Sequence, residues 1–225
     1  MASREEFEGY SRLRLYPPIT NPNWLVLRSR RRIFNEWLRE MPSGLQVLDI
    51  GGALQPYRAL LNEPIYTAID LVPSPLVDQI ASADDLPFSD DTFDLIICTQ
   101  VLEYVLDPKA IFAEIGRVLK PNGRLLASAP SILPIWAESD RWRFSYEMLC
   151  DLTSEFASAE IVAEIGTVGT VLRTVGVWME TNLPLKRLWR YSAFPVLNAL
   201  GVLFEPTRKP LFTANYSVFA IKAAA

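Results

Sequence analysis

The sequence predicts an α/β fold built on a doubly wound, mostly parallel β-sheet. Between residues 23 and 130, short apolar runs with the length of buried strands alternate with amphipathic segments of helical length. The first apolar run ends at Asp49 and passes into a glycine turn, as strands do in α/β sheets that bind a ligand at their carboxyl edge. Half of the 225 residues are hydrophobic, so the chain can bury a sizeable core.

The first part of the chain predicts two helices and two strands. Apolar residues that include Ile33, Trp37 and Met41 recur at helical spacing, and Pro42 marks where that helix stops. Pro56 suits the first position of a second helix, because its missing N–H would have no partner there. The expected elements are helices over 23–41 and 56–62 and strands over 45–49 and 65–69.

The middle of the chain continues the alternation. Residues 93–98 are a third apolar run, and Asp107 and Pro108 suit the cap and the first position of a helix. A tight turn at 121–123 then leads into a strand over 124–129.

The regular alternation ends after residue 130. Prolines and aromatic residues indicate an irregular segment that contains Pro130, Pro134, Trp136, Trp142 and Phe144. The elements expected beyond it are a strand over 160–166, an apolar helical stretch over 168–204 interrupted by Pro184 and Pro195, and a last strand over 215–222.

Composition excludes several classes of function. The net charge is −4 and the pI is near 5.1, which argues against nucleic-acid binding, since that normally needs a basic surface. The chain has no histidine, so we expect neither a metal site nor a histidine-based catalytic triad. Cys98 and Cys150 lie in apolar contexts and suit a reducing, cytoplasmic setting. We expect no membrane-spanning helix, because no apolar run is long enough.

The glycine turn at 51–52 indicates the kind of ligand. A dinucleotide fingerprint needs glycine at the positions of Ala53 and Pro56. Asp49 beside the turn suits a ligand with positive charge and no phosphate, and S-adenosylmethionine, with its sulfonium and amino groups, is such a ligand. Asp70 follows at the end of the next strand, where a carboxylate can accept hydrogen bonds from both ribose hydroxyls.

Further motifs extend this pattern in a fixed order. They are Val47 to Gly51, Asp70, the run Asp-Leu-Pro-Phe-Ser-Asp-Asp-Thr-Phe-Asp-Leu at 85–95, Leu-Glu-Tyr-Val at 102–105 and Leu-Lys-Pro-Asn-Gly-Arg-Leu at 119–125. Because these motifs occur in this order, residues 44–130 resemble a class I S-adenosylmethionine-dependent methyltransferase, similar to the methyltransferase type 11 family.

The resemblance implies a Rossmann-like, three-layer α/β/α fold with helical cap elements, and a seven-stranded sheet whose last strand is antiparallel. It divides the chain into an N-terminal helical segment over 1–42 and a methyltransferase domain over 43–225. Within that domain we expect an acceptor-side lid at 130–150, a helical cap insertion at 168–208 and the final strand at 214–222.

The resemblance also assigns contacts with S-adenosylmethionine. The backbone of Gly51 and Gly52 approaches the methionine part, Asp70 holds the ribose, and Leu71 lies against the adenine. Ala53 departs from the family pattern, which has a second glycine there. The residues expected at the cofactor are Asp49, Gly51, Gly52, Asp70, Leu71, Ala83, Asp84 and Gln100.

The segment Asp-Arg-Trp-Arg-Phe-Ser at 140–145 resembles part of a methyltransferase branch that is associated with surface glycans and other sugar-containing products. We expect Trp142 and Phe144 to wall the acceptor pocket, and Arg141 or Arg143 to bind a phosphate or carboxylate. Tyr104 is also expected at the substrate. The alternative is a packed lid, in which the aromatic residues are core and Arg143 ties down the backbone.

A hydroxyl acceptor benefits from a general base. Without histidine, that base must be a carboxylate or an activated tyrosine, and the candidates are Asp140 and Glu103. Glu103 also has a simpler interpretation as a helix-start residue with an electrostatic role.

Two surface features each allow two interpretations. The cluster of Arg28, Arg30, Arg31 and Arg32 is either the solvated face of a helix or an anion clamp for a lipid-linked diphosphate or a bilayer surface. The apolar segment 183–204 is either a cap over the substrate pocket or a surface for peripheral membrane contact or homodimer formation. The oligomeric state is therefore expected to be monomer or homodimer.

These observations lead us to expect S-adenosylmethionine-dependent O-methylation of a sugar-containing or other small-molecule acceptor by direct in-line methyl transfer. One alternative is a non-catalytic methyltransferase-like subunit that binds a partner. A second is a nicotinamide-dependent sugar enzyme, which Pro56 disfavours.

Overall fold

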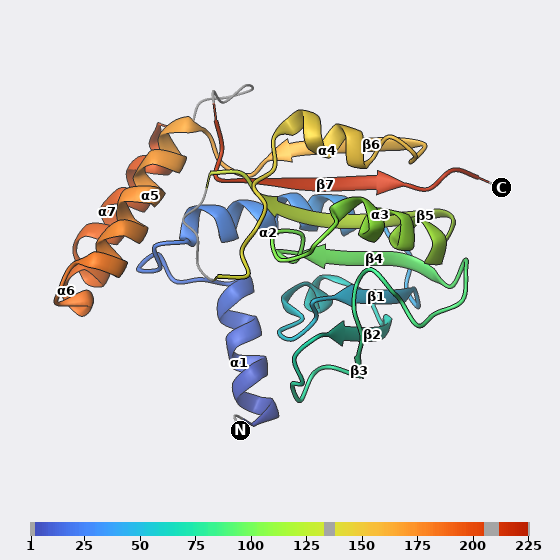
Figure 1. Cartoon of the computed structure of the whole chain (residues 1–225). Helices are drawn as coiled ribbons and strands as arrows, with labels where there is room; N and C mark the ends of the chain where they lie inside the picture. Colours follow the sequence, from blue (N-terminus) through green and yellow to red (C-terminus); the bar gives the residue numbers. More distant parts are fainter. Residues whose placement is uncertain (1–2, 133–137, 205–211, 225) are drawn as a thin grey trace.

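The strands of the chain form a seven-stranded sheet with the order β3-β2-β1-β4-β5-β7-β6 (Figure 1). This computed structural model describes residues 3–132, 138–204 and 212–224. Strands β1 to β5 pair in parallel, whereas β7 runs antiparallel to both β5 and β6, which confirms the expected Rossmann-like sheet. The strands are β1 (Gln46–Ile50), β2 (Ile65–Asp70), β3 (Gln79–Ile80), β4 (Phe93–Thr99), β5 (Leu119–Pro130), β6 (Ser158–Ala163) and β7 (Asn215–Ile221).

The centre of the sheet explains where a ligand can bind. Strand β1 lies between β2 and β4, so the order of the strands reverses beside it. Its side chains from Val47 to Ile50 are buried, as expected for a central parallel strand with helices on both faces. The carboxyl ends of these strands lie at one edge of the sheet, and a reversal of strand order leaves a crevice at that edge.

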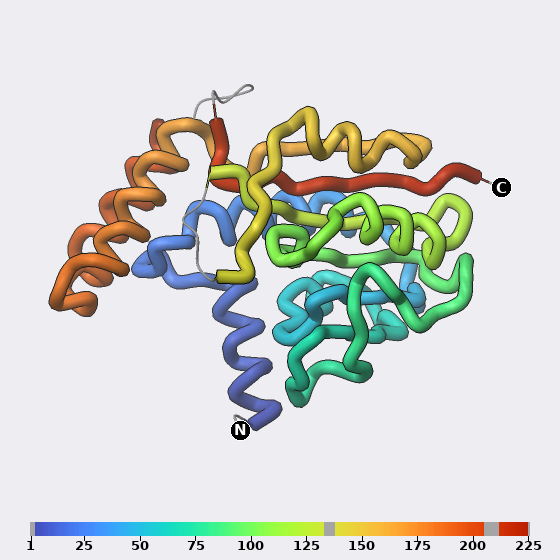
Figure 2. Tube along the Cα trace, viewed as in Figure 1, coloured from blue at the N-terminus to red at the C-terminus, as the bar shows by residue number. Residues whose placement is uncertain are grey.

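Helices cover both faces of the sheet (Figures 1 and 2). Helix α2 (Trp24–Leu38) lies on one face, and α3 (Pro108–Val118) and α4 (Tyr146–Leu152) lie on the other. The remaining helices are beyond the carboxyl edge of the parallel strands or beside it: α1 (Arg4–Leu15), the short 3₁₀ helix η1 (Pro56–Leu60), α5 (Thr167–Asn182), α6 (Lys186–Tyr191) and α7 (Ala193–Leu203).

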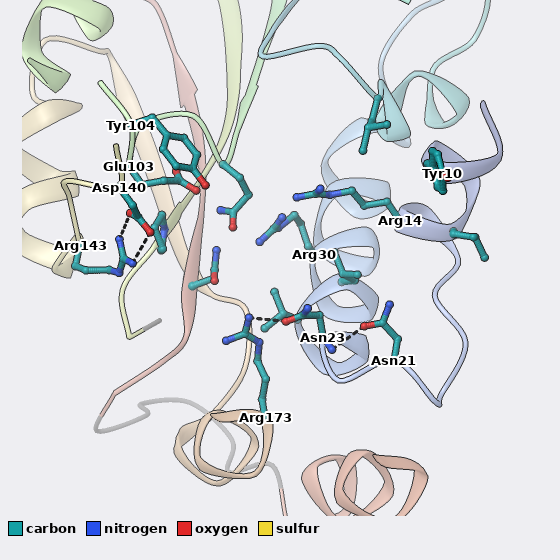
Figure 3. Close-up of a pocket in the computed structure, with 17 residues that line it drawn as sticks. Tyr10, Arg14, Asn21, Asn23, Arg30, Glu103, Tyr104, Asp140, Arg143 and Arg173 are labelled. Carbon is teal, nitrogen blue, oxygen red and sulfur yellow. Dashed lines mark hydrogen bonds and ion pairs between the residues drawn. The ribbon is translucent and has the colours of Figure 1, made fainter. Parts of the chain in front are cut away.

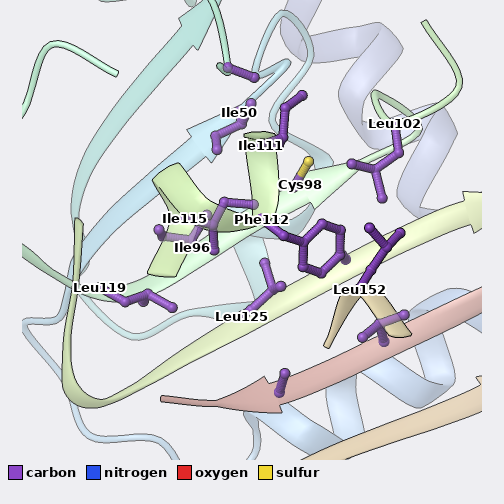
Figure 4. Packing of buried hydrophobic residues seen from close by; sticks show 14 of the residues in the cluster. Ile50, Ile96, Cys98, Leu102, Ile111, Phe112, Ile115, Leu119, Leu125 and Leu152 are labelled. Carbon is purple, nitrogen blue, oxygen red and sulfur yellow. The ribbon is translucent and has the colours of Figure 1, made fainter. Parts of the chain in front are cut away.

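Two clusters of buried apolar side chains hold these layers together. The larger lies between the sheet and α3 and α4, and Figure 4 shows Ile96 and Leu125 of the sheet close to Ile115 and Phe112 of α3. The smaller lies on the face covered by α2 and includes Phe34. Each fully buried large apolar side chain contributes about 1.5–3 kcal/mol, so these clusters fix the strand edge on which the site is built.

The prediction of a helix over 56–62 is wrong. The structure has only the 3₁₀ turn η1, and Gln55 before it adopts a left-handed backbone conformation with φ of 50°. Glu63 is also left-handed, with φ of 47°, and Pro64 follows it, so only a few residues remain for a helix.

Other expectations hold with shifted boundaries. The helix expected over 23–41 ends at Leu38, and the strand expected over 124–129 begins earlier, because the turn at 121–123 lies within β5 as an irregularity of its pairing with β4. The last strand is confirmed at 215–221. Pro134 and Trp136 lie outside the described residues, as do residues 205–208 of the expected cap.

The apolar stretch expected over 168–204 is three helices rather than one interrupted helix. The helical conformation is interrupted at Pro184 and Leu185, and Leu185 has φ of 59°. Pro195 does not break α7, because it lies in the first turn, where its missing N–H is not needed. Within the described part of the chain, none of the helices is both long and apolar enough to cross a bilayer.

Candidate active site

A cavity of about 470 Å³ lies at the carboxyl ends of β1, β2 and β4. It contains six of the eight residues expected at the cofactor, namely Gly51, Asp70, Leu71, Ala83, Asp84 and Gln100. The residues were expected from separate motifs, and the sheet brings them to one crevice.

The turn at Gly51 leaves no room for a side chain. Gly51 has φ of 75°, and the peptide N–H groups of Gly51 and Gly52 both donate to the carbonyl oxygen of Ile69 at 2.9 Å. A Cβ atom on Gly51 would collide with the side chain of Val101, and one on Gly52 would lie 2.8 Å from the Cβ of Ala68. Both glycines are therefore required by packing, but only Gly51 lines the cavity.

Asp49 lies behind the turn rather than in the cavity. Its carboxylate is buried and accepts a hydrogen bond of 2.6 Å from the Tyr66 hydroxyl. Burial raises the pKa of Asp49 to about 7, with a further contribution from the charge of Asp70. Asp49 is thus placed to influence the turn electrostatically and not to contact a ligand in this cavity.

A second cavity, of about 660 Å³, has the lining residues drawn in Figure 3. Its walls come from α1, α2, α5, the segment after β4 and the described part of the expected lid. Gln100 and Tyr104 line both cavities, so the two spaces meet at these side chains. Gln100 has φ of 56°, a strained conformation for a residue with a side chain, and such strain is often found at functional sites.

Glu103 points into the second cavity (Figure 3). It is 5% exposed, and its Oε2 has no hydrogen-bond partner among the described residues. Burial raises the pKa of Glu103 to about 7. The carbonyl oxygen of Glu103 accepts hydrogen bonds from the backbone N–H of Arg141, at 2.7 Å, and of Trp142, at 3.2 Å, which ties the lid to this residue.

The other candidate base, Asp140, is already engaged. Its carboxylate is buried and forms an ion pair with Arg143, in which Nη2 donates to Oδ2 at 2.9 Å. The hydrogen bonds from Asp140 raise the pKa of Arg143. Both residues line the second cavity as a paired unit.

Arg141 and Trp142 line neither cavity, although both were expected at the acceptor. The side chain of Arg141 is exposed. Trp142 packs against the larger apolar cluster, and its indole N–H donates to the carbonyl oxygen of Val105 at 2.8 Å. Phe144 is also core, and Ser145 caps α4, so this segment has the packing role that was the alternative interpretation.

Truncating Trp142 tests that role. We expect Trp142→Ala to lower the free energy of unfolding by about 3 kcal/mol, because it removes a large packed ring and its hydrogen bond. Thermal melting measures this, and Trp142→Phe should recover part of the loss. A variant that melts like the wild type would contradict the packing role and return Trp142 to the acceptor site.

Sequence reasoning missed several polar residues of the second cavity. They are Arg14 on α1, Asn21 and Asn23 before α2, Arg30 on α2 and Arg173 on α5. The available signal was weak: Arg173 is the one basic residue of α5.

The burial of Arg30 shows that the arginine cluster is not simply the solvated face of a helix. Arg30 is 1% exposed, and its Nε and Nη2 donate to Glu164 at 2.7 and 3.0 Å. Burial alone would lower the pKa of Arg30, but the Glu164 carboxylate raises it. The guanidinium group of Arg28 stacks on the ring of Trp24, and that of Arg31 stacks on the ring of Tyr16. Arg32 is exposed to solvent.

Known proteins resemble part of this chain in sequence. Residues 48–127 match the family model described as "Methyltransferase domain". The chain is 36% identical over 110 residues to the ubiquinone biosynthesis O-methyltransferase of Xanthomonas oryzae pv. oryzae (strain PXO99A), a match that covers 41% of this chain and 46% of the relative. It is 31% identical over 105 residues to a ubiquinone/menaquinone biosynthesis C-methyltransferase of Desulfotalea psychrophila, with coverage of 39% and 43%. The chain thus spans about half the length of these curated relatives.

Solved structures agree on the fold. Haemonchus contortus phosphoethanolamine N-methyltransferase 2, in complex with phosphomonomethylethanolamine and S-adenosylhomocysteine, has a TM-score of 0.59 at 14% identity, over 100% of this chain and 61% of that one. The YcgJ protein of Bacillus subtilis has a TM-score of 0.56 at 17% identity, over 88% and 99%. Residues 48–127 thus match a methyltransferase domain, and the chain has the fold of the class I S-adenosylmethionine-dependent methyltransferases.

The smaller cavity fits S-adenosylmethionine, the expected cofactor of a methyltransferase domain. Leu71 and Val72 are 69% and 65% exposed and form an apolar ledge suited to the flat adenine ring. Asp70 accepts a hydrogen bond from the backbone N–H of Val72 at 2.9 Å, and its carboxylate lines the cavity, where ribose hydroxyls can reach it. Gly51, which has no side chain, leaves space in the cavity beside Asp70 and Leu71.

Asp70→Ala is expected to weaken binding of S-adenosylhomocysteine by about 30- to 1000-fold. Two charge-assisted hydrogen bonds to ribose are worth roughly 2–4 kcal/mol together. Isothermal titration calorimetry measures the change, and Asp151→Ala, which alters an exposed carboxylate on α4, is the matched control. Affinity within a few-fold of wild type would show that Asp70 does not hold the ribose.

Proposed function

We propose that this methyltransferase transfers a methyl group to a hydroxyl oxygen of a small-molecule acceptor that binds in the larger cavity. The observation that carries the proposal is the meeting of two cavities at Gln100 and Tyr104. A donor in one cavity and an acceptor in the other would face each other across this junction. Glu103, beside the junction, supplies a carboxylate on the acceptor side.

S-adenosylmethionine supplies an electrophilic methyl group when it is bound. The residues of this chain therefore need to align the acceptor and exclude water. Tyr104, which is shared by both cavities, is suited to orient the acceptor at the junction. The backbone hydrogen bonds from Arg141 and Trp142 to Glu103 hold the lid over this end of the cavity.

Glu103 is the proposed general base. An acceptor hydroxyl must lose its proton during transfer, and the unpartnered Oε2 of Glu103 is free to take it. The pKa of about 7 suits a base that works near neutral pH, because such a group is ionised yet still binds a proton readily. Asp140 is less suited, since Arg143 occupies both of its oxygens. We assign this pair a positioning role in the lid.

The acceptor is proposed to be a sugar-containing or similar polar small molecule. The resemblance of residues 140–145 to a glycan-associated branch supports a sugar, and the polar lining of the larger cavity suits it. The name of the Xanthomonas relative supports oxygen as the atom that is methylated. We also propose a cytoplasmic location, because Cys98 and Cys150 are free thiols, which suits a reducing compartment.

Transfer of labelled methyl groups tests the proposal. The purified protein is incubated with methyl-labelled S-adenosylmethionine and a small-molecule extract of source cells, and the products are separated by mass. We expect label in a low-mass compound, at a position that resists amide and ester hydrolysis. Binding of S-adenosylhomocysteine with no transfer to any fraction would instead support the non-catalytic alternative, and binding of NAD in its place would support the nicotinamide-dependent one.

A further inference from the structure

Four arginines line the larger cavity, and they differ in how their charges are balanced (Figure 3). Arg30 is neutralised by Glu164, and Arg143 by Asp140. Arg14 and Arg173 have no ion pair with any residue that the structure describes. The wall formed by α1, α2 and α5 therefore carries two positive charges that the protein itself leaves unbalanced.

Arg173 is the more unusual of the two. It is 5% exposed, and only its Nη2 has a partner, the Oδ1 of Asn23 at 2.5 Å. Its Nε and Nη1 have no hydrogen-bond partner among the described residues. Burial, with the charge of Arg30 nearby, lowers the pKa of Arg173 to about 10, so the group is still cationic at neutral pH. A buried cation with unused donors is costly for the fold, which suggests that a ligand completes it.

Arg14 reaches the same cavity from α1 (Figure 3). It forms no hydrogen bond within the described part of the chain, and although the residue as a whole is exposed, desolvation of its guanidinium group lowers its pKa, with a further contribution from Arg30. Asn21 and Asn23 line the cavity near these arginines and add neutral amide groups. The remaining carboxylates of the cavity, Glu103 and Asp140, lie on the wall across from Arg14 and Arg173 in Figure 3.

We propose that Arg14 and Arg173 bind a phosphate group of the acceptor, and hence that the acceptor is a phosphorylated small molecule. This inference rests on the proposed function. Two guanidinium groups with free N–H donors match the charge and the oxygen geometry of a phosphate dianion better than those of a single carboxylate. The acceptor then lies with its phosphate at the arginine wall and its reacting hydroxyl near Glu103. This places its two ends at opposite walls of one cavity of about 660 Å³.

Titration with inorganic phosphate and with pyrophosphate tests the inference. The protein is first saturated with S-adenosylhomocysteine, and calorimetry is run at constant ionic strength, with acetate as the carboxylate probe. We expect saturable binding of at least one phosphate probe, and weaker binding of acetate. Arg14→Met and Arg173→Met should each weaken phosphate binding by at least about tenfold. Arg12→Met, an exposed arginine on the same helix as Arg14 that does not line this cavity, should leave it within about twofold.

Thermal melting separates a ligand-binding role of Arg173 from a structural one. Because its guanidinium is buried with unused donors, Arg173→Met should melt at or above the wild-type temperature without phosphate. The variant should also lose the rise in melting temperature that phosphate gives the wild type. If Arg173→Met melts well below the wild type, Arg173→Lys, which keeps the charge, should still bind phosphate more tightly than the methionine variant.

Unchanged phosphate binding in both methionine variants would overturn the inference, and so would the absence of saturable binding to the wild type. Preference for acetate over both phosphate probes would overturn the assignment to phosphate. These outcomes are distinct from failure of the proposed function. If the wild type does not bind S-adenosylhomocysteine, the proposed function fails, while the same phosphate titration of the free protein still tests the arginine wall.

Discussion

Replacing Gly51 with valine is expected to abolish binding of S-adenosylhomocysteine. Gly51 has φ of 75°, which a β-branched residue adopts only with strain, and a Cβ atom there collides with the side chain of Val101. Val101 itself lines the cofactor cavity, so it cannot move aside without changing the shape of that cavity. Calorimetry should detect no binding to the variant, although the sheet is intact.

Two further variants make the Gly51 test specific. Gly116→Ala in α3 is the matched control, because a Cβ atom there meets nothing within 4 Å. The double variant Gly51→Ala with Val101→Ala should bind better than Gly51→Ala alone, since the colliding side chain is removed. Circular dichroism and thermal melting establish that each variant is folded. Wild-type affinity in a folded Gly51→Val would refute the placement of the cofactor at this turn.

Glu103→Gln is expected to lower turnover by about a hundredfold to ten-thousandfold. The amide keeps the size of the carboxylate but cannot accept the acceptor's proton, and general base catalysis typically contributes this much. Affinity for S-adenosylhomocysteine should change little, because Glu103 lines the acceptor cavity and not the cofactor cavity. A loss of cofactor affinity in proportion to turnover would point instead to a structural role.

The proposed role of Glu103 also predicts how kcat/KM depends on pH. Burial raises the pKa of Glu103 to about 7, so the fraction of ionised carboxylate grows as the pH rises through that value. The wild-type kcat/KM should therefore increase with pH up to about 7 and level off above it. The Gln variant should lack this step, and a step that persists in it would assign the titration to another group.

The strands of the site could be predicted because their sequence signal is local. Gly51 follows β1 and Asp70 ends β2, so both lie where the apolar runs end, and parallel strands bring such ends to one edge. Six of the eight expected cofactor residues accordingly line one cavity. Asp49 and Gly52 do not line this cavity: Asp49 lies within β1 with its carboxylate bound to Tyr66, and Gly52 packs against Ala68 behind the turn.

The acceptor cavity could not be predicted in the same way. Arg14 lies on α1, Asn23 just before α2 and Arg173 on α5, and nothing in the spacing of any one of these segments marks its polar residue as part of a cavity. The placement of Trp142 at the acceptor was wrong for a different reason. An aromatic residue such as Trp142 suits a pocket wall and a core equally well, and only its contacts with Val105 and the apolar cluster decide between them.

The central claim is that donor and acceptor meet at Gln100 and Tyr104, between two adjoining cavities. A crystal structure of the protein with S-adenosylhomocysteine tests it most directly. We predict the ribose at Asp70, the adenine against Leu71, and the sulfur atom at the junction, facing the larger cavity and Glu103. S-adenosylhomocysteine bound elsewhere, or bound with its sulfur turned away from Gln100 and Tyr104, would contradict the account.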